Sequence, residues 1–177
     1  MINWIPNVTK AYEAMAYVAQ DPIGYDIHKM WGALFEADLL HMRTYGRSIY
    51  GEHWDVAWHG VRPQVASGLL SGDQSVHAML DPEKRPDNCP TPWALRLNSL
   101  GGPNLDMLSP SDLECLDAGL ERVRSEAPRD TILRIMMDPV VAKAKGGTLN
   151  PRDMLNPPFA SPAHIANLEA AMATCVF

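Results

Sequence analysis

One long helix, predicted from Asp26 to Tyr45, constrains the fold of this chain more than any other segment. Asp26 is a residue type that caps helix N-termini, and Gly46 stands where a left-handed residue would end the helix. Its apolar positions are Ile27, Met30, Trp31, Leu34, Phe35, Leu39 and Met42. Because these positions cover a broad stripe, we expect this helix to lie at the centre of the hydrophobic core.

Further helices are predicted from capping residues and from apolar spacing of i, i+3 and i+4. The first is capped by Asn7 or Thr9 and ends near Gln20. Ser111 and Glu114 have the spacing of a capping box for a helix that begins there. The remaining predicted ranges are 63–70 with Pro63 as the first helical residue, 131–145 with an interruption at Pro139, 151–155, and about 162–175.

A small β element is predicted directly after the long helix. Residues 49–57 alternate between apolar and polar types toward their end, which is typical of a strand or hairpin. Trp54 and Trp58 then share one face of that strand, and Gly60 and Pro63 are expected to break it.

Residues 82–103 contain five prolines, which exclude regular structure there except for a short strand at 93–97. No repeat or linker divides the chain, and 177 residues suffice for one domain. The predicted fold is α+β, a mostly α-helical single domain over 1–177 with a small antiparallel β element.

Composition limits the classes of function. A net charge of −6 argues against a general nucleic-acid binder. Three cysteines without paired spacing indicate a reducing compartment rather than a disulfide framework. No apolar run approaches the roughly 20 residues of a membrane span, and the first ten residues lack the pattern of a signal peptide. We therefore expect a protein of the cytoplasm, in a bacterium or in a phage-infected cell, that acts without a membrane.

The segment 35–63 carries the most specific pattern in the chain. Its distinctive positions are Ala37, Asp38, His41, Tyr45, Gly46, Arg47, Ile49, Gly51, Glu52, Trp54, Ala57 and Gly60. Together they resemble the signature of the Panacea (SocA-like, GepA-like) domain, a family best known as antitoxins of bacterial toxin–antitoxin pairs. The chain departs from the signature at Glu52, where the family has Asp, and at 61–63, where Val-Arg-Pro replaces Gly-Pro-Val-Pro.

Two later segments extend the resemblance over roughly residues 10–155. Residues 108–117 are similar to the start of a family helix, and 132–145 contains a Met-Asp-Pro step like the family's acid–proline step. A histidine-containing stretch that precedes this step in the family is missing. The insertion at 82–103 and the tail after Leu155 have no counterpart in the family pattern.

The resemblance implies a binding protein rather than an enzyme, one that neutralises a toxin by direct protein–protein contact. The candidate partner-binding residues are Asp38, His41, Tyr45, Arg47, Glu52, Trp54, Trp58 and Arg62. A hairpin edge that accepts a partner strand, or the proline-rich segment, would offer further contacts. No cofactor or metal is expected.

Several alternatives stay open for these residues. Asp38, His41 and Tyr45 share a helix face and are expected either to brace the following turn, to shape a recognition surface, or to form a catalytic Asp–His pair. The two tryptophans either pack on the helix or anchor a partner. A zinc-type set of His41, His53 and His59 with Asp38 or Glu52 would suit a small metal-dependent enzyme, although no C-x-x-C or H-E-x-x-H pattern supports it.

The function itself also has alternatives. The chain could be a phage or mobile-element protein that inhibits or redirects a host protein, either by blocking a host defence or regulatory protein or as an adaptor for proteolysis. A transcriptional regulator ranks last, because no helix-turn-helix pattern is evident and the chain is acidic. Oligomeric state and the identity of the partner are not predicted.

Overall fold

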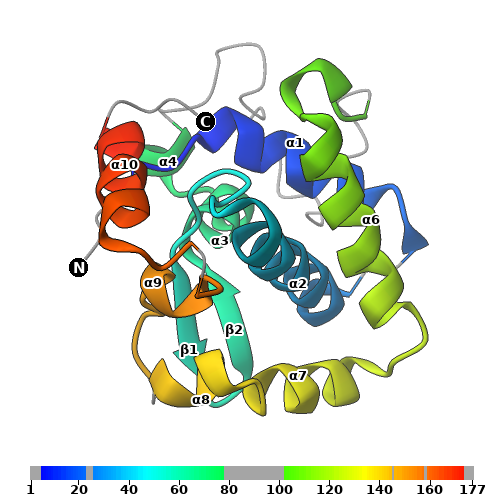
Figure 1. Cartoon of the computed structure of the whole chain (residues 1–177). Coiled ribbons are helices and arrows are strands. Elements are labelled where there is room, and N and C mark those ends of the chain that lie inside the picture. Colours follow the sequence, from blue (N-terminus) through cyan, green and yellow to red (C-terminus); the bar gives the residue numbers. More distant parts are fainter. Residues whose placement is uncertain (1–4, 23–25, 78–101, 145, 158, 174–177) are drawn as a thin grey trace.

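The computed structural model describes residues 5–22, 26–77, 102–144, 146–157 and 159–173. Figure 1 shows helix α2 (Ile27–Tyr45) in the middle of the molecule, between α1 (Val8–Ala19), α6 (Pro110–Arg124), α7 (Pro128–Met136) and a β-hairpin. The predicted class, a mostly helical α+β fold with a small antiparallel β element, is confirmed.

The other elements are short or peripheral. They are β1 (Trp54–Ala57), β2 (Gly60–Pro63), α3 (Gln64–Ser71), α4 (Gln74–His77), the 3-10 helix η3 (Leu105–Met107), α8 (Pro139–Ala144), α9 (Pro151–Met154) and α10 (Pro162–Ala173). The predicted strand at 93–97, most of the proline-rich segment and the last residues of the predicted C-terminal helix lie outside the described residues.

The ends of α2 form as its sequence predicts. The Asp26 carboxylate accepts hydrogen bonds from the backbone N–H groups of His28 and Lys29. Gly46 has a left-handed backbone (φ 71°) and its N–H closes the last turn on Met42. The first helix begins after Asn7, which is therefore the cap in preference to Thr9.

Other helix boundaries differ from the predictions. In α6 the capping box joins Ser109 to Asp112, not Ser111 to Glu114, because the helix begins at Pro110. Pro63 precedes α3 as its N-cap instead of being its first residue. The predicted interruption at Pro139 falls just before that proline, which begins α8.

The hairpin lies further along the chain than predicted. Residues 49–53 form no strand, and β1 pairs with β2 so that Trp54 faces Pro63 and Ala57 faces Gly60. The two residues predicted to break the strand are thus the ends of β2. Gly60 takes a positive φ of 116° beside the turn, and a proline is tolerated at a strand end where no ladder N–H is needed.

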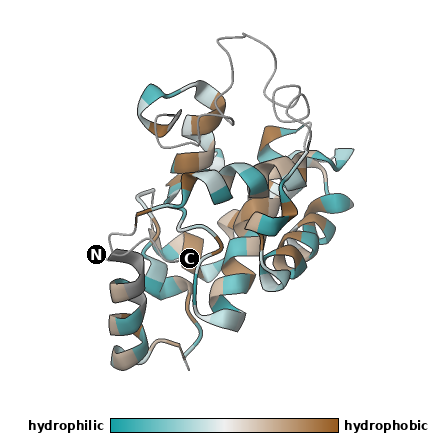
Figure 2. Ribbon diagram, turned by 90° about the horizontal axis from the view of Figure 1, so that it is seen from above, coloured by the Kyte–Doolittle hydropathy of each residue, from teal (hydrophilic) through white to brown (hydrophobic). Residues whose placement is uncertain are grey.

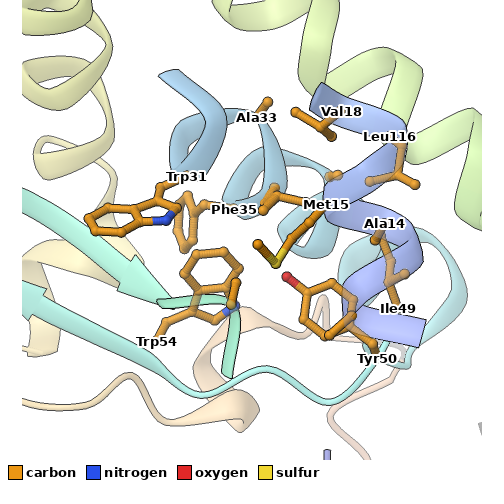
Figure 3. Close-up of a cluster of buried hydrophobic side chains, with 14 of the residues drawn as sticks. Ala14, Met15, Val18, Trp31, Ala33, Phe35, Ile49, Tyr50, Trp54 and Leu116 are labelled. Carbon is orange, nitrogen blue, oxygen red and sulfur yellow. The ribbon is translucent and has the colours of Figure 1, made fainter. Parts of the chain in front are cut away.

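Hydrophobic contacts from four segments meet on one side of α2. Figure 3 shows Phe35 beside Trp54, with Met15 of α1 and Tyr50 next to them. The Phe35 and Trp54 rings meet edge to face with centroids 5.2 Å apart. Figure 2 shows hydrophobic and hydrophilic bands alternating along the helices, as expected for helices that each bury one face. No helix in the described part of the chain is long and apolar enough to cross a membrane.

Helix α6 packs on the opposite side of α2 at a very short distance. A Cβ added to Gly119 would lie 2.3 Å from the Ala33 carbonyl oxygen and 3.0 Å from the Ala37 nitrogen. Both atoms belong to the backbone of α2, so only glycine allows the two helices to approach this closely.

Gly119→Ala should therefore destabilise the fold by about 2 kcal/mol, because separating the helices costs more than the roughly 1 kcal/mol that alanine contributes to helix propensity. Urea unfolding measures the loss. Ala118→Ser on the exposed neighbouring position is the control and should change stability little. A Gly119→Ala protein as stable as the control would show that the helices are not in such close contact.

Candidate protein-binding site

The carboxylate of Asp38 fastens the segment after α2 to the helix itself. Its Oδ1 accepts hydrogen bonds from the Ser48 hydroxyl at 2.7 Å and from the Ile49 N–H at 2.9 Å. Its Oδ2 accepts the indole N–H of Trp54 at 2.9 Å. Asp38 is 1% exposed, so these three donors replace the water that the charge has lost.

His41, one turn further along α2, connects that same segment to α6. Its Nδ1 lies 2.8 Å from the Arg47 carbonyl oxygen, and its Nε2 lies 3.2 Å from both the Ser111 hydroxyl and the Asp112 carboxylate. Asp112 also meets the Lys10 ammonium at 2.7 Å and the Arg47 guanidinium at 3.6 Å. One buried carboxylate therefore gathers cationic and hydrogen-bonding groups from α1, α2 and the following turn.

Glu52 provides the N-terminal cap that α3 lacks. The residue at the N-cap position is Pro63, whose side chain has no oxygen. Glu52 instead accepts hydrogen bonds from the backbone N–H groups of Val65 at 2.9 Å and Ala66 at 3.1 Å, and from that of His53 at 2.9 Å. A carboxylate at this end of a helix is also favoured by the helix dipole.

Burial and hydrogen bonding shift the pKa values of these three acids in different directions. Burial raises the pKa of Asp38, in opposition to the three bonds that it accepts. Burial likewise raises the pKa of Glu52 to about 8, because its backbone N–H bonds offset only part of the desolvation. Burial acts in the same sense on Asp112, but its bonds from His41 and Lys10 outweigh it and hold the pKa below the usual range.

Four of the eight candidate residues are thus buried and engaged with the protein itself. They are Asp38, His41, Glu52 and Trp54. Tyr45 is 37% exposed, lies beside the His41 ring at a centroid distance of 4.8 Å and donates its hydroxyl hydrogen to Glu114. These contacts agree with the alternative in which Asp38, His41 and Tyr45 brace the turn that follows the helix.

The prediction that Trp54 and Trp58 share a strand face is wrong. Strand β1 ends at Ala57, and Trp58 belongs to the turn that joins β1 to β2. Trp54 is 1% exposed in the core, whereas Trp58 is 91% exposed at the tip of the hairpin, where its ring is roughly perpendicular to that of His59. Trp54 therefore packs in the core, whereas Trp58 is free to contact a partner.

The edge of β1 is covered, so the expected open edge of the hairpin is not found there. The Val56 N–H donates to the Gly147 carbonyl, and the Leu149 N–H donates to the Trp54 carbonyl, so residues 147–149 lie along β1. A partner strand could pair with β1 only after displacing these residues.

The histidines proposed as a zinc-type set lie apart. His41 contacts α6, His53 lines a cleft beside α3, and His59 lies at the hairpin turn. Within the described ranges, no three or more His, Cys, Asp or Glu side chains are placed to hold a metal ion. The arrangement gives no support to that alternative.

Sequence reasoning missed the residues that complete the network. Asp112 joins α6 to His41, Lys10 reaches it from α1, and Ser48 bonds both Asp38 and the Gly51 N–H. The spacing of Ser109 and Asp112 was a signal for Asp112, since it has the form of a capping box. A buried lysine in an otherwise ordinary first helix carries no such signal.

Comparison of the chain with protein-family models, with curated proteins and with solved structures found no match.

Asp38→Asn tests the bracing role. The carboxylate accepts hydrogen bonds from three donors, and the amide would turn its own N–H groups toward at least one of them. That donor would lose its acceptor, so we expect a loss of about 3 kcal/mol in unfolding free energy. Asp106→Asn, on an exposed position, should have little effect and serves as the control. Equal stability of both variants would contradict the role assigned to Asp38.

Glu52 should make stability depend on pH. A glutamate titrates near 4.5 in the unfolded chain and near 8 in the fold, so between these values only the folded state holds the proton. The free energy of unfolding should fall as pH rises from about 4.5 to about 8, and then level off. Thermal melts from pH 5 to 9 should show this slope in the wild type and in Glu121→Gln, and a shallower slope in Glu52→Gln, where Asp38, whose pKa is also raised, is unchanged. Parallel curves for all three proteins would exclude the role of Glu52.

Proposed function

We propose that this chain is an antitoxin-like binding protein that neutralises a partner toxin by direct protein–protein contact. The resemblance of segment 35–63 to the Panacea signature suggests this class of function. The observation that carries the proposal is the 91% exposed Trp58 at the end of a hairpin whose strand β1 is bonded to residues 147–149. Tryptophan is among the residue types that contribute most to protein interfaces.

The hairpin holds Trp58 in place before any partner arrives. Trp54 bonds Asp38 at the base of β1, and residues 147–149 pair with the outer edge of that strand. Figure 1 shows the turn of the hairpin at the end of the molecule next to α7 and α8. A side chain presented on a fixed backbone loses little entropy on binding, so more of its contact energy contributes to affinity.

The buried polar network supports binding rather than catalysis at the signature residues. The Asp38 carboxylate is surrounded by three donors, and His41 is 0% exposed with both ring nitrogens next to protein oxygens. A substrate would have to displace these contacts to reach either group. The network instead suits a rigid scaffold whose surface residues make the contacts.

Arg47 contributes to the fold as well as to the surface, unlike a residue that only contacts a partner. Its guanidinium lies 3.2 Å from the Ser111 hydroxyl and 3.6 Å from the Asp112 carboxylate. Its backbone carbonyl accepts a hydrogen bond from the His41 ring. Replacing Arg47 is therefore expected to lower stability as well as any partner binding, whereas replacing Trp58 is expected to affect binding alone.

The prediction for Trp58→Ala follows from its exposure. The tagged protein is first used to capture its partner from the native host, and the captured protein is identified by mass spectrometry and produced separately. In titration calorimetry we expect Trp58→Ala to weaken binding at least about tenfold, which is a modest effect for an interface tryptophan, with an unchanged melting temperature.

Leu105→Ala is the matched control, because Leu105 is a 50% exposed apolar residue on η3, which contacts α1 at the far end from the hairpin turn. It should leave affinity and melting temperature unchanged. Wild-type affinity in the Trp58 variant would remove the hairpin tip from the interface. A small toxin as the captured partner would agree with an antitoxin, and a large host complex would indicate an inhibitor or adaptor instead.

A further inference from the structure

A cleft of about 770 Å³ lies between the hairpin and the helices α2, α3 and α4. Its apolar lining includes Ile27, Trp31, Val65, Leu70 and Val76. Three of its polar lining residues, Gln64, Ser67 and Ser71, follow one another along α3 at i, i+3 and i+7 spacing. Because residues at this spacing share one face of a helix, α3 gives the cleft a polar edge next to its apolar lining.

The polar side chains along α3 donate hydrogen bonds within the protein. The Gln64 amide donates to the Asp55 carboxylate at 2.8 Å. The Ser67 hydroxyl donates to the Gln64 carbonyl at 3.2 Å. The Ser71 hydroxyl donates to the Gly68 carbonyl at 3.1 Å. A hydroxyl has one hydrogen but two lone pairs, so the two serine oxygens can still accept a hydrogen bond and have none left to donate. The edge of the cleft along α3 is therefore rich in acceptors.

Carboxylates stand at both ends of this edge. Asp55 is bonded to the first residue of α3, and Asp73 follows the last turn of that helix. Arg62 is the one arginine among the described lining residues, which include no lysine, and it lies 3.8 Å from Asp55. Two carboxylates thus stand against one guanidinium, and with His53 neutral the lining carries an excess of negative charge.

The end of the cleft at Asp73 is the more favourable place for a cation. The Asp73 Oδ1 accepts the N–H and the hydroxyl of Ser75 at 2.9 and 2.6 Å, and these bonds orient the carboxylate without removing its charge. The residue is exposed and comes just after the C-terminus of α3, where the helix dipole also favours positive charge. The Ser71 oxygen lies in the last turn of the same helix.

We infer that this cleft binds a short basic–apolar segment of the partner protein, with a lysine or arginine against Asp73 and an apolar side chain over Leu70 and Val76. Arg62, at the other end, can donate to backbone carbonyl oxygens of the same segment. A net charge of −6 would attract such a partner over a longer range. The inference rests on the proposed function, because it takes the ligand to be part of a protein, and it adds a second contact of stated chemistry to the hairpin tip.

The walls of the cleft belong to elements that other contacts fix in place. Glu52 holds the first turn of α3 through the Val65 N–H. A Cβ added to Gly68 would lie 2.7 Å from the Val76 side chain, so α4 packs closely on α3. Figure 3 shows Trp31 extending from α2 toward the strands. Side chains on regular elements favour a defined binding geometry.

The test uses the full chain and peptides of defined charge. The wild type is titrated with acetyl-Leu-Lys-Leu-amide, and binding is followed by the backbone N–H signals of Ser67, Gly68 and Ser71 in a nitrogen–proton correlation spectrum. We expect saturable shifts of these signals. Acetyl-Leu-Gln-Leu-amide lacks the charge, and acetyl-Gly-Lys-Gly-amide lacks the apolar side chains. Each should bind about fivefold more weakly or worse, as expected for the loss of a partly exposed charge pair or of buried apolar area.

Asp73→Asn should reduce the affinity for the lysine peptide by a similar factor. Asparagine caps a helix as well as aspartate does, so the start of α4 should be kept. Asp106→Asn is the matched control, because Asp106 is an exposed aspartate on η3 and does not line the cleft. Signals that do not move, equal binding of the lysine peptide and either comparison peptide, or undiminished binding by Asp73→Asn would each overturn the inference.

The captured partner separates this inference from the proposed function. Trp58→Ala should bind the lysine peptide as the wild type does while losing affinity for the partner, and Asp73→Asn should lose affinity for both. If the partner needs Trp58 but not Asp73, the proposed function stands and the cleft contact is wrong. If the peptide and the partner both need Asp73 and the partner is indifferent to Trp58, the cleft stands and the hairpin tip is wrong.

Discussion

The stability of this fold depends on carboxyl groups that are buried away from water and that accept hydrogen bonds from backbone and side-chain donors. The stretch after α2 and the first turn of α3 contain N–H groups that no helix or strand bonds, among them those of Ile49, Val65 and Ala66. Asp38 and Glu52 accept these hydrogen bonds. A buried N–H without an acceptor costs roughly as much as a lost hydrogen bond, so the path of the chain through this region requires an acid at each place.

These bonds also decide where the surface groups are. Asp38 holds Trp54, which begins β1 and therefore sets the direction of the hairpin and of Trp58 at its tip. Glu52 holds the start of α3, which forms one wall of the cleft that Arg62 lines. Contacts in the interior thus position the hairpin tip and one wall of the cleft, although Asp38 and Glu52 are themselves buried.

The sequence predicts well those features that depend on neighbouring residues. The caps of α2 follow from Asp26 and Gly46, since a side-chain oxygen and a left-handed backbone act within one turn. The position of the hairpin could not be predicted in this way, because alternation at 54–58 fits either a longer strand or a strand followed by a turn. Asp112 and Lys10 were missed for a related reason: their bond joins α6 to α1, and no local pattern records a contact over about a hundred residues.

The proposed likeness to the Panacea signature, which no family model supports, concerns the scaffold more than the partner. Most signature positions that carry polar chemistry, such as Asp38, His41 and Glu52, are buried. Trp58 is not a signature position, and Arg62 lies where the chain departs from the pattern. If binding uses these two residues, a common scaffold can present different contact surfaces. Substitutions at surface positions outside the buried network change stability little. A shared signature would then accompany partners of different chemistry, and the exposed residues of each chain would have to identify its own partner.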